Sequence, residues 1–153
     1  MEKNNTFQEI WDKLSSAKKV VMTLHAAPDG DSLGACTAMK KILEKKLKCQ
    51  VEIVSYDSLA DNLMLMPIAK EIKFGIDISD VPLTESDVFL FLDSELKNQS
   101  GKLKDKFSIK EAKFVINIDH HSTNLGFGNL NYVDGKRPST CSVLIDLCRE
   151  LNI

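Results

Sequence analysis

Three stretches of the sequence combine aspartate and histidine, two residue types that bind divalent metal ions. The residues are His25, Asp29 and Asp31 in the first stretch, Asp93 in the second, and Asp119, His120 and His121 in the third. All three histidines of the chain belong to this set. Carboxylates and imidazoles without thiolates favour Mn²⁺ and related ions, and clustered aspartates repel one another unless a cation offsets their charge. The set therefore predicts a divalent-metal site.

The first stretch suits a loop that presents carboxylates to two neighbouring ions. Pro28 and Gly30 stiffen and tighten the chain around Asp29 and Asp31, and Gly34 permits a close backbone approach at the start of the next helix. A helix amino terminus also favours an anion such as phosphate. Two ions about 3.5–4 Å apart can clamp a phosphate and activate a water for in-line attack on phosphorus. The predicted chemistry is metal-dependent attack of water on a phosphate group.

Each stretch also has an ordinary structural explanation. A D-x-D sequence is commonly a solvated turn, a His-His pair occurs on many surfaces and in many cores, and an aspartate after a strand often caps a helix. Caps alone explain three such stretches at successive strand ends poorly. A structural domain with an incidental cluster stays an alternative, and it predicts that Mn²⁺ does not raise the melting temperature.

The predicted strands place the three stretches at one edge of a sheet. Short apolar runs predict strands at Lys19–Leu24, Asp87–Leu92 and Lys113–Ile118, and each run leads directly into one of the stretches. The other expected elements are strands at Gln50–Ser55 and Leu130–Val133, helices from Thr6 to about Ala17, at Leu33–Leu47, at Leu59–Ile72 with an interruption at Pro67, and at Ser139–Leu151, a loop at Asp77–Ser86, and connecting structure at Phe107–Glu111.

The alternation of strands and helices predicts an α/β fold with a mostly parallel central sheet and helices on both faces. Continuous apolar strands fit a sheet that is covered on both sides. In such sheets ligands bind beyond the carboxyl ends of the strands. The expected fold therefore brings the three stretches to the edge where ligands are bound.

The three stretches together resemble the DHH phosphoesterase superfamily. The resemblance extends from about Lys19 to the end of the chain and rests on H-x-x-x-D-x-D-x-x-G from His25, on Asp93, and on D-H-H from Asp119. The form H-x-x-P-D-G-D-x-x-G is most similar to bacterial nanoRNases and 3′-phosphoadenosine-5′-phosphate (pAp) phosphatases. The resemblance implies a DHH-type domain that hydrolyses phosphoester bonds of short RNA or pAp with two Mn²⁺ ions, with Mg²⁺ or Co²⁺ as alternatives.

The resemblance also implies roles for individual residues. His25 and Asp29 would bind one ion, Asp31 and His120 would bind the other, and Asp93 would bridge both. In the catalytic pair of the third stretch, His121 would contact the scissile phosphate or its leaving oxygen, and Asp119 would orient a histidine.

The segment before the last helix carries a second group of candidate residues. These are Lys136, Arg137, Ser139 and Thr140. They either hold a phosphate at a helix amino terminus or serve as solvated loop charges and a helix cap. Asp134, just before Gly135, is expected to be a turn residue. Glu95 is expected either to begin a helix or to lie near the metals.

The resemblance covers less than a whole member of the superfamily. Members continue after the closing helix into a strand with a further metal-binding aspartate and then into a smaller substrate domain. We expect residues 1–153 to be the N-terminal DHH domain without that C-terminal domain. Pyrophosphate or polyphosphate hydrolysis, and an inactive metal- or nucleotide-binding fragment, remain alternative functions.

Composition limits the classes of protein that the chain can represent. A net charge of −2 and 43% hydrophobic residues are ordinary for a globular domain, and the charge gives no broad basic face for duplex DNA. The apolar runs are too short for a membrane span. The polar start without a signal-peptide pattern predicts a cytoplasmic protein, and four cysteines without a C-x-x-C pair predict buried free thiols. An exposed apolar face left by the absent domain would permit a homodimer.

Overall fold

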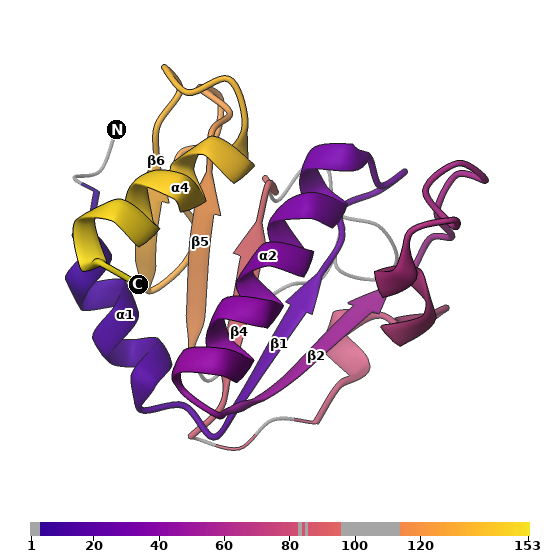
Figure 1. The fold of residues 1–153 in the computed structure, drawn as a ribbon, viewed down its shortest axis with the longest axis horizontal. Coiled ribbons are helices and arrows are strands. Elements are labelled where there is room, and N and C mark those ends of the chain that lie inside the picture. Colours follow the sequence, from indigo (N-terminus) through magenta and orange to yellow (C-terminus); the bar gives the residue numbers. More distant parts are fainter. Residues whose placement is uncertain (1–3, 83, 85, 96–113) are drawn as a thin grey trace.

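One parallel sheet of six strands organises the molecule, in the order β3-β2-β1-β4-β5-β6 (Figure 1). The structure is a computed structural model that describes residues 4–82, 84, 86–95 and 114–153. The strands are β1 Lys19–Thr23, β2 Gln50–Ser55, β3 Ile72–Phe74, β4 Val88–Leu92, β5 Val115–Asp119 and β6 Leu130–Val133. The helices are α1 Phe7–Ser15, α2 Gly30–Lys46 and α4 Thr140–Leu151, with short 3-10 helices η1 Pro67–Glu71 and η2 Ile78–Asp80.

The order of the strands reverses direction between β1 and β4. The chain runs outward from β1 to β2 and β3, then returns to β4 on the other side of β1 and continues to β5 and β6. Such a switch point leaves a crevice beyond the carboxyl ends of the two central strands, where α/β proteins bind ligands. The predicted metal-binding stretches follow β1, β4 and β5, so the topology places them around this crevice.

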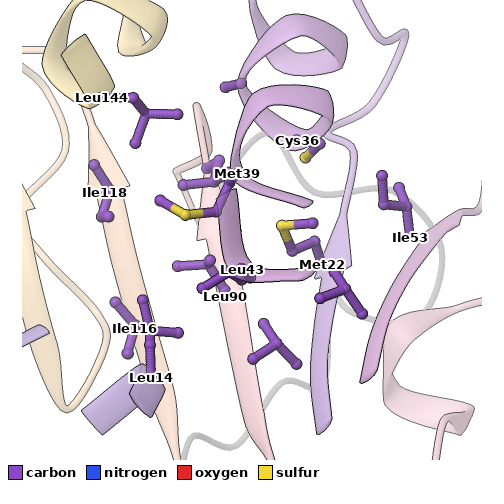
Figure 2. Close-up of a cluster of buried hydrophobic side chains, with 14 of the residues drawn as sticks. Leu14, Met22, Cys36, Met39, Leu43, Ile53, Leu90, Ile116, Ile118 and Leu144 are labelled. Carbon is purple, nitrogen blue, oxygen red and sulfur yellow. The ribbon is translucent and has the colours of Figure 1, made fainter. Parts of the chain in front are cut away.

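Both faces of the sheet are covered, which confirms the predicted α/β class. The larger core lies between the sheet and α1, α2 and α4, and Figure 2 shows Met22, Met39, Leu43, Leu90 and Ile116 within it. On the opposite face, the described residues that cover the strands come from η2 and from the loop before β6; the apolar members of this smaller cluster are Val21, Val54, Ile78, Phe89, Phe91, Val115 and Phe127. These two layers hold the strand ends in fixed positions.

The predicted helix at Leu59–Ile72 is wrong. In the structure, turns lead into η1, and Ile72 then begins β3, which pairs in parallel with β2. Pro67 lacks a backbone N–H, and it favours an extended backbone at the residue before it; Met66 indeed has φ −69° and ψ 134°. Leu65 is 85% exposed, so the apolar spacing that suggested a helix does not mark a buried face.

Several smaller expectations are also settled. Thr6 and Glu9 form the predicted capping box of α1. The second helix begins at Gly30, earlier than predicted, because the Asp29 side chain accepts from the N–H groups of Asp31 and Ser32. Phe107–Glu111 lies outside the described residues. None of the described helices is long and apolar enough to cross a membrane.

The cysteine prediction is correct in one respect and wrong in another. All four cysteines are free thiols, but only Cys36 is buried. Cys49, Cys141 and Cys148 are partly exposed. Cys141 and Cys148 line an open apolar groove together with residues of α2 and α4, and Cys49 lies just before β2. Whether each thiol is buried thus depends on tertiary packing, and the spacing of the cysteines in the sequence does not reveal that packing.

An ion-pair network joins the first three strands of the sheet. Glu52 on β2 lies 2.8 Å from the Nζ of Lys19 on β1 and 2.7 Å from the Nζ of Lys73 on β3. The hydrogen bond from Lys19, and to a smaller extent the one from Lys73, lowers the pKa of Glu52. A carboxyl group with a lowered folded-state pKa contributes stability above its unfolded-state pKa of about 4.3 and loses this contribution as the pH falls through the folded-state pKa.

We therefore expect Glu52→Gln to lower the free energy of unfolding at pH 7 by about 1 kcal/mol. The difference from the wild type should shrink as the pH falls below 4, because the wild-type carboxylate is then protonated as well. Urea unfolding at pH 7 and at pH 3 measures both effects. Glu71→Gln is the control, since its exposed carboxylate lies 3.6 Å from Lys40. Equal losses for Glu52→Gln at the two pH values would contradict this assignment.

Candidate functional site

The loop after β1 orients the first histidine of the site. His25 Nδ1 lies 2.7 Å from the carbonyl oxygen of Ala26. A carbonyl only accepts, so Nδ1 carries the proton of the neutral ring and Nε2 presents a lone pair. Nε2 lies 3.6 Å from an oxygen of Asp29 and 3.6 Å from an oxygen of Asp93. The ring is therefore oriented as in a metal-binding histidine.

Asp93 occupies the centre of the site at the end of β4. Its side chain is almost fully buried, with the residue 1% exposed, and its backbone has φ 57°, in the left-handed region. Oδ2 lies 3.6 Å from Nε2 of His25, whereas Oδ1 lies 3.5 Å from Nε2 of His120. The hydroxyl of Thr140 donates to Oδ1 at 2.9 Å. One carboxylate thus lies between two histidines, with one oxygen toward each.

His120 repeats the arrangement of His25 on the other side of Asp93. Its Nδ1 lies 3.2 Å from the carbonyl oxygen of Arg137, which leaves Nε2 directed toward the acidic side chains. Nε2 lies 3.7 Å from Oδ2 of Asp31. The two oxygens of Asp31 accept from the backbone N–H groups of Thr140, at 2.7 Å, and Cys141, at 3.0 Å. Asp31 therefore also fixes the start of α4 against the start of α2.

Asp119 makes hydrogen bonds that hold the third stretch in place. Its Oδ1 accepts from the backbone N–H of His120 at 2.7 Å and lies 2.8 Å from Nδ1 of His121. Its Oδ2 accepts from the side-chain amide of Asn124 at 2.6 Å. The residue is fully buried. Asp119 is thus occupied by protein donors, while Nε2 of His121 stays available.

The donor atoms around Asp93 lie farther apart than in hydrogen bonds and close to the separation of two ligands on one metal ion. The histidine–carboxylate distances around Asp93 are longer than ordinary hydrogen bonds of about 2.7–3.2 Å. Two ligands each about 2.1 Å from one ion lie about 3–3.5 Å apart. Among the described residues, two groups of candidate metal ligands share Asp93: His25, Asp29 and Asp93 form one, and Asp93, Asp119, His120 and His121 form the other. Asp93 is therefore the carboxylate that both groups of candidate ligands share.

The charges of the cluster favour added positive charge. The Asp93 carboxylate, with an oxygen 3.6 Å from Nε2, raises the pKa of His25 to about 9, with further contributions from the carbonyl of Ala26 and from Asp29 and against the opposing effect of burial. Burial alone would lower the pKa of His121, but its hydrogen bond to Asp119 and the nearby carboxylates raise it. Without a metal the cluster therefore retains protons, and a divalent ion would take their place.

The residues before α4 mainly make contacts that stabilise the fold. The hydroxyl of Ser139 caps α4 by accepting from Ser142 N–H, and the guanidinium of Arg137 pairs with Asp146 and with Asp134. Asp134 accepts from the N–H groups of residues 136 and 137, as expected of a turn residue. Of the four predicted phosphate-binding residues, Thr140 joins the cluster through Asp93, and Lys136 is exposed.

Sequence reasoning missed two buried amides that belong to the site. Asn117 lies within the otherwise apolar part of β5, and Asn124 lies in the loop that follows; both are buried and hydrogen-bonded to the ends of β4 and β5. A polar residue in the middle of an apolar strand was the available signal. Glu95, which the sequence left between two roles, is also buried, and its charge helps to raise the pKa of His121.

Comparisons with known proteins identify relatives of this chain. The chain is 25% identical, over its full length, to the bifunctional oligoribonuclease and PAP phosphatase NrnA of Thermus thermophilus, and 23% identical over 94% of its length to a probable NrnA of Streptococcus mutans. It spans 46% and 43% of these two proteins. A crystal structure of an exopolyphosphatase-related protein from Bacteroides fragilis shares the fold, with a TM-score of 0.81 and 23% identity over 94% of this chain and 43% of that one.

The family comparison covers all of the residues discussed above. The N-terminal domain of the DHH family matches residues 19–153, which include every aspartate and histidine around Asp93. Because this match extends over most of the chain, the protein belongs to the DHH family.

Proposed function

We propose that this chain is the metal-binding domain of a phosphoesterase that hydrolyses short oligoribonucleotides or pAp with two Mn²⁺ ions. The observation that carries the proposal is the position of Asp93, with one oxygen toward His25 and the other toward His120. The relatives named as oligoribonuclease and PAP phosphatase support the substrate class. In this proposal His25, Asp29 and Asp93 hold one ion, and Asp93, Asp31 and His120 hold the other.

The ions would supply positive charge for the phosphate oxygens and would lower the pKa of water. The protein's own residues would position the substrate. Asp119 holds the ring of His121 through Nδ1, so Nε2 of His121 is available to donate to the scissile phosphate or its leaving oxygen. The raised pKa of His121 favours the protonated ring that such a donor requires. Thr140 fixes the central carboxylate through its hydroxyl.

In this proposal fewer residues of the loop before α4 contact phosphate than the sequence suggested. The side chains of Arg137 and Ser139 already have protein partners. We therefore assign a contact with substrate phosphate to Lys136, which is exposed and lies four residues before Thr140 in the sequence. A cytoplasmic location and a homodimer stay predictions.

The test is hydrolysis by the 153-residue chain with Mn²⁺ and with three separate substrates: pAp, a short RNA and pyrophosphate. We expect AMP and phosphate from pAp, mononucleotides from RNA, and loss of both activities with EDTA or in His120→Ala. Lys13→Ala, on α1, is the control variant and should keep both activities. Melting curves with and without Mn²⁺ accompany the assays.

The alternatives give different results in the same experiment. Hydrolysis of pyrophosphate alone would replace the proposed substrate class with the pyrophosphatase alternative. No hydrolysis, with a Mn²⁺-induced rise in melting temperature, would overturn the activity of this chain and leave a metal-binding module. No hydrolysis and no rise would overturn the metal site as well and favour a structural domain.

A further inference from the structure

A buried amide connects the two strand ends that carry the site. The Nδ2 of Asn124 lies 2.6 Å from Oδ2 of Asp119, 2.9 Å from the side-chain oxygen of Asn117 and 3.0 Å from the backbone oxygen of Ser94. The side-chain oxygen of Asn124 accepts from Gly126 N–H at 2.9 Å. Asn124 is only 3% exposed. One side chain therefore contacts the residue after Asp93 and the first residue of the D-H-H stretch.

We propose that Asn124 is a positioning residue of the metal centre, which sets Asp93 of β4 relative to the D-H-H stretch of β5 without contacting an ion. The inference rests on the proposed function, because it concerns the same metal ions. It extends that function by assigning the relative placement of the two ligand-bearing strand ends to a residue outside the ligand set.

The backbone at the end of β4 needs such support. Asp93 N–H still donates to the carbonyl of Ile118, as in the strand ladder, but the left-handed φ of Asp93 then turns the chain away. The carbonyl of Ser94 is instead taken by the side-chain amides of Asn117, at 3.0 Å, and Asn124. A non-glycine residue at positive φ persists where surrounding contacts determine it. The two amides supply those contacts and so aim the Asp93 carboxylate.

The same amide also restrains the histidines through Asp119. With Oδ2 of Asp119 bound to Asn124, Oδ1 faces His121 Nδ1 and the N–H of His120. Rotation of this carboxylate would release both histidines. Removing Asn124 therefore loosens Asp93 on one side and His120 and His121 on the other. Partners of metal ligands that do not touch the ion typically affect metal affinity about 10–100-fold when they are removed.

Mn²⁺ titration by calorimetry, together with electron paramagnetic resonance, tests the proposal on the full chain. We expect wild type to bind two ions with the resonance of a coupled pair. Asn124→Ala should bind Mn²⁺ about 10–100-fold more weakly and lose the coupled signal. Asn124→Ser keeps a small hydrogen-bond donor, so its Mn²⁺ affinity should lie between those of the wild type and Asn124→Ala. This variant tests the proposal if the alanine variant does not fold.

Asn131→Ala is the matched control. Asn131 is also an asparagine near the third stretch, and its side chain makes two hydrogen bonds of 2.8 Å with the backbone of Gly128. Its replacement should lower the melting temperature but leave Mn²⁺ affinity and the resonance unchanged. A folded Asn124 variant with wild-type affinity and resonance would overturn the positioning role. Absence of Mn²⁺ binding by wild type would instead overturn the proposed function, and the two failures are therefore distinguishable.

Discussion

Replacing Asp93 by asparagine should abolish the stabilisation of this protein by Mn²⁺. At a Mn²⁺ concentration of 100 times its dissociation constant, one bound ion stabilises the wild type by about 2.7 kcal/mol, which corresponds to a rise of about 5–10 °C in melting temperature for a domain of this size. Asp93 faces both histidines, so its loss should remove a ligand from both ions. Hydrolytic activity should fall at least about 1,000-fold, because two-metal chemistry requires both ions.

Asparagine is the appropriate replacement at this position. It matches aspartate in shape and tolerates the left-handed backbone that Asp93 adopts at φ 57°. The variant therefore changes the charge and one oxygen with little strain. Any loss of Mn²⁺ binding then reports on the carboxylate.

Asp87→Asn is the matched control for this variant. Asp87 lies just before the other end of β4, is 6% exposed, and accepts from the N–H and the hydroxyl of Thr84 at 2.8 Å each. Its replacement should lower the melting temperature without Mn²⁺ and keep the rise that Mn²⁺ produces. Differential scanning fluorimetry with and without Mn²⁺ compares both variants. A full Mn²⁺-induced rise in Asp93→Asn would exclude a bridging role for this carboxylate.

Replacing Asp119 by asparagine should destabilise the metal-free protein by about 2–3 kcal/mol. If the new oxygen keeps the bond to His121, the new NH₂ group lies where Oδ2 now accepts from Asn124 at 2.6 Å. Two donors would then face each other in a buried site. Rotation of Asn124 does not relieve this conflict, because its NH₂ group also faces the oxygens of Asn117 and Ser94.

Urea unfolding in EDTA measures this effect apart from metal binding. Asp61→Asn, at an exposed position of the turns before η1, is the control and should change stability by less than about 0.5 kcal/mol. We also expect Asp119→Asn to lower activity, because a neutral amide oxygen holds the ring of His121 less strongly than the carboxylate does. Stability equal to wild type would show that Asp119 is not the fixed acceptor described above.

The strands that carry the candidate site were predictable because their signals are local. Runs such as Val88–Leu92 are buried on both sides and contain no polar residue, so they read as strands of a covered sheet. Period and composition placed the aspartates and histidines at the carboxyl ends of those strands. The parallel order then required only that neighbouring strands bring these ends together, which β1, β4 and β5 do.

The segment at Leu59–Ile72 was not predictable from the same signals. Its apolar spacing is compatible with a helix, but Ile72–Phe74 gains backbone hydrogen bonds by pairing with β2, and this partner is distant in sequence. Likewise, nothing local distinguishes the structural Arg137 from a phosphate-binding one, since its partner Asp146 lies two turns into α4.

By itself, then, the sequence determined five of the six strands, the fold class and the set of aspartates and histidines at the strand ends, because periodicity and residue type are local properties. Only the tertiary structure decided which atom of each side chain faces which neighbour. His25 and His120 present Nε2 because backbone carbonyls occupy the positions beside Nδ1, and Asn124 connects β4 to β5 because both strand ends leave buried acceptors beside it. The His25–Ala26 contact joins neighbouring residues, but the contacts of His120 with Arg137 and of Asn124 with Ser94 join separate elements, so these two exist only once the sheet and the segment before α4 have packed together.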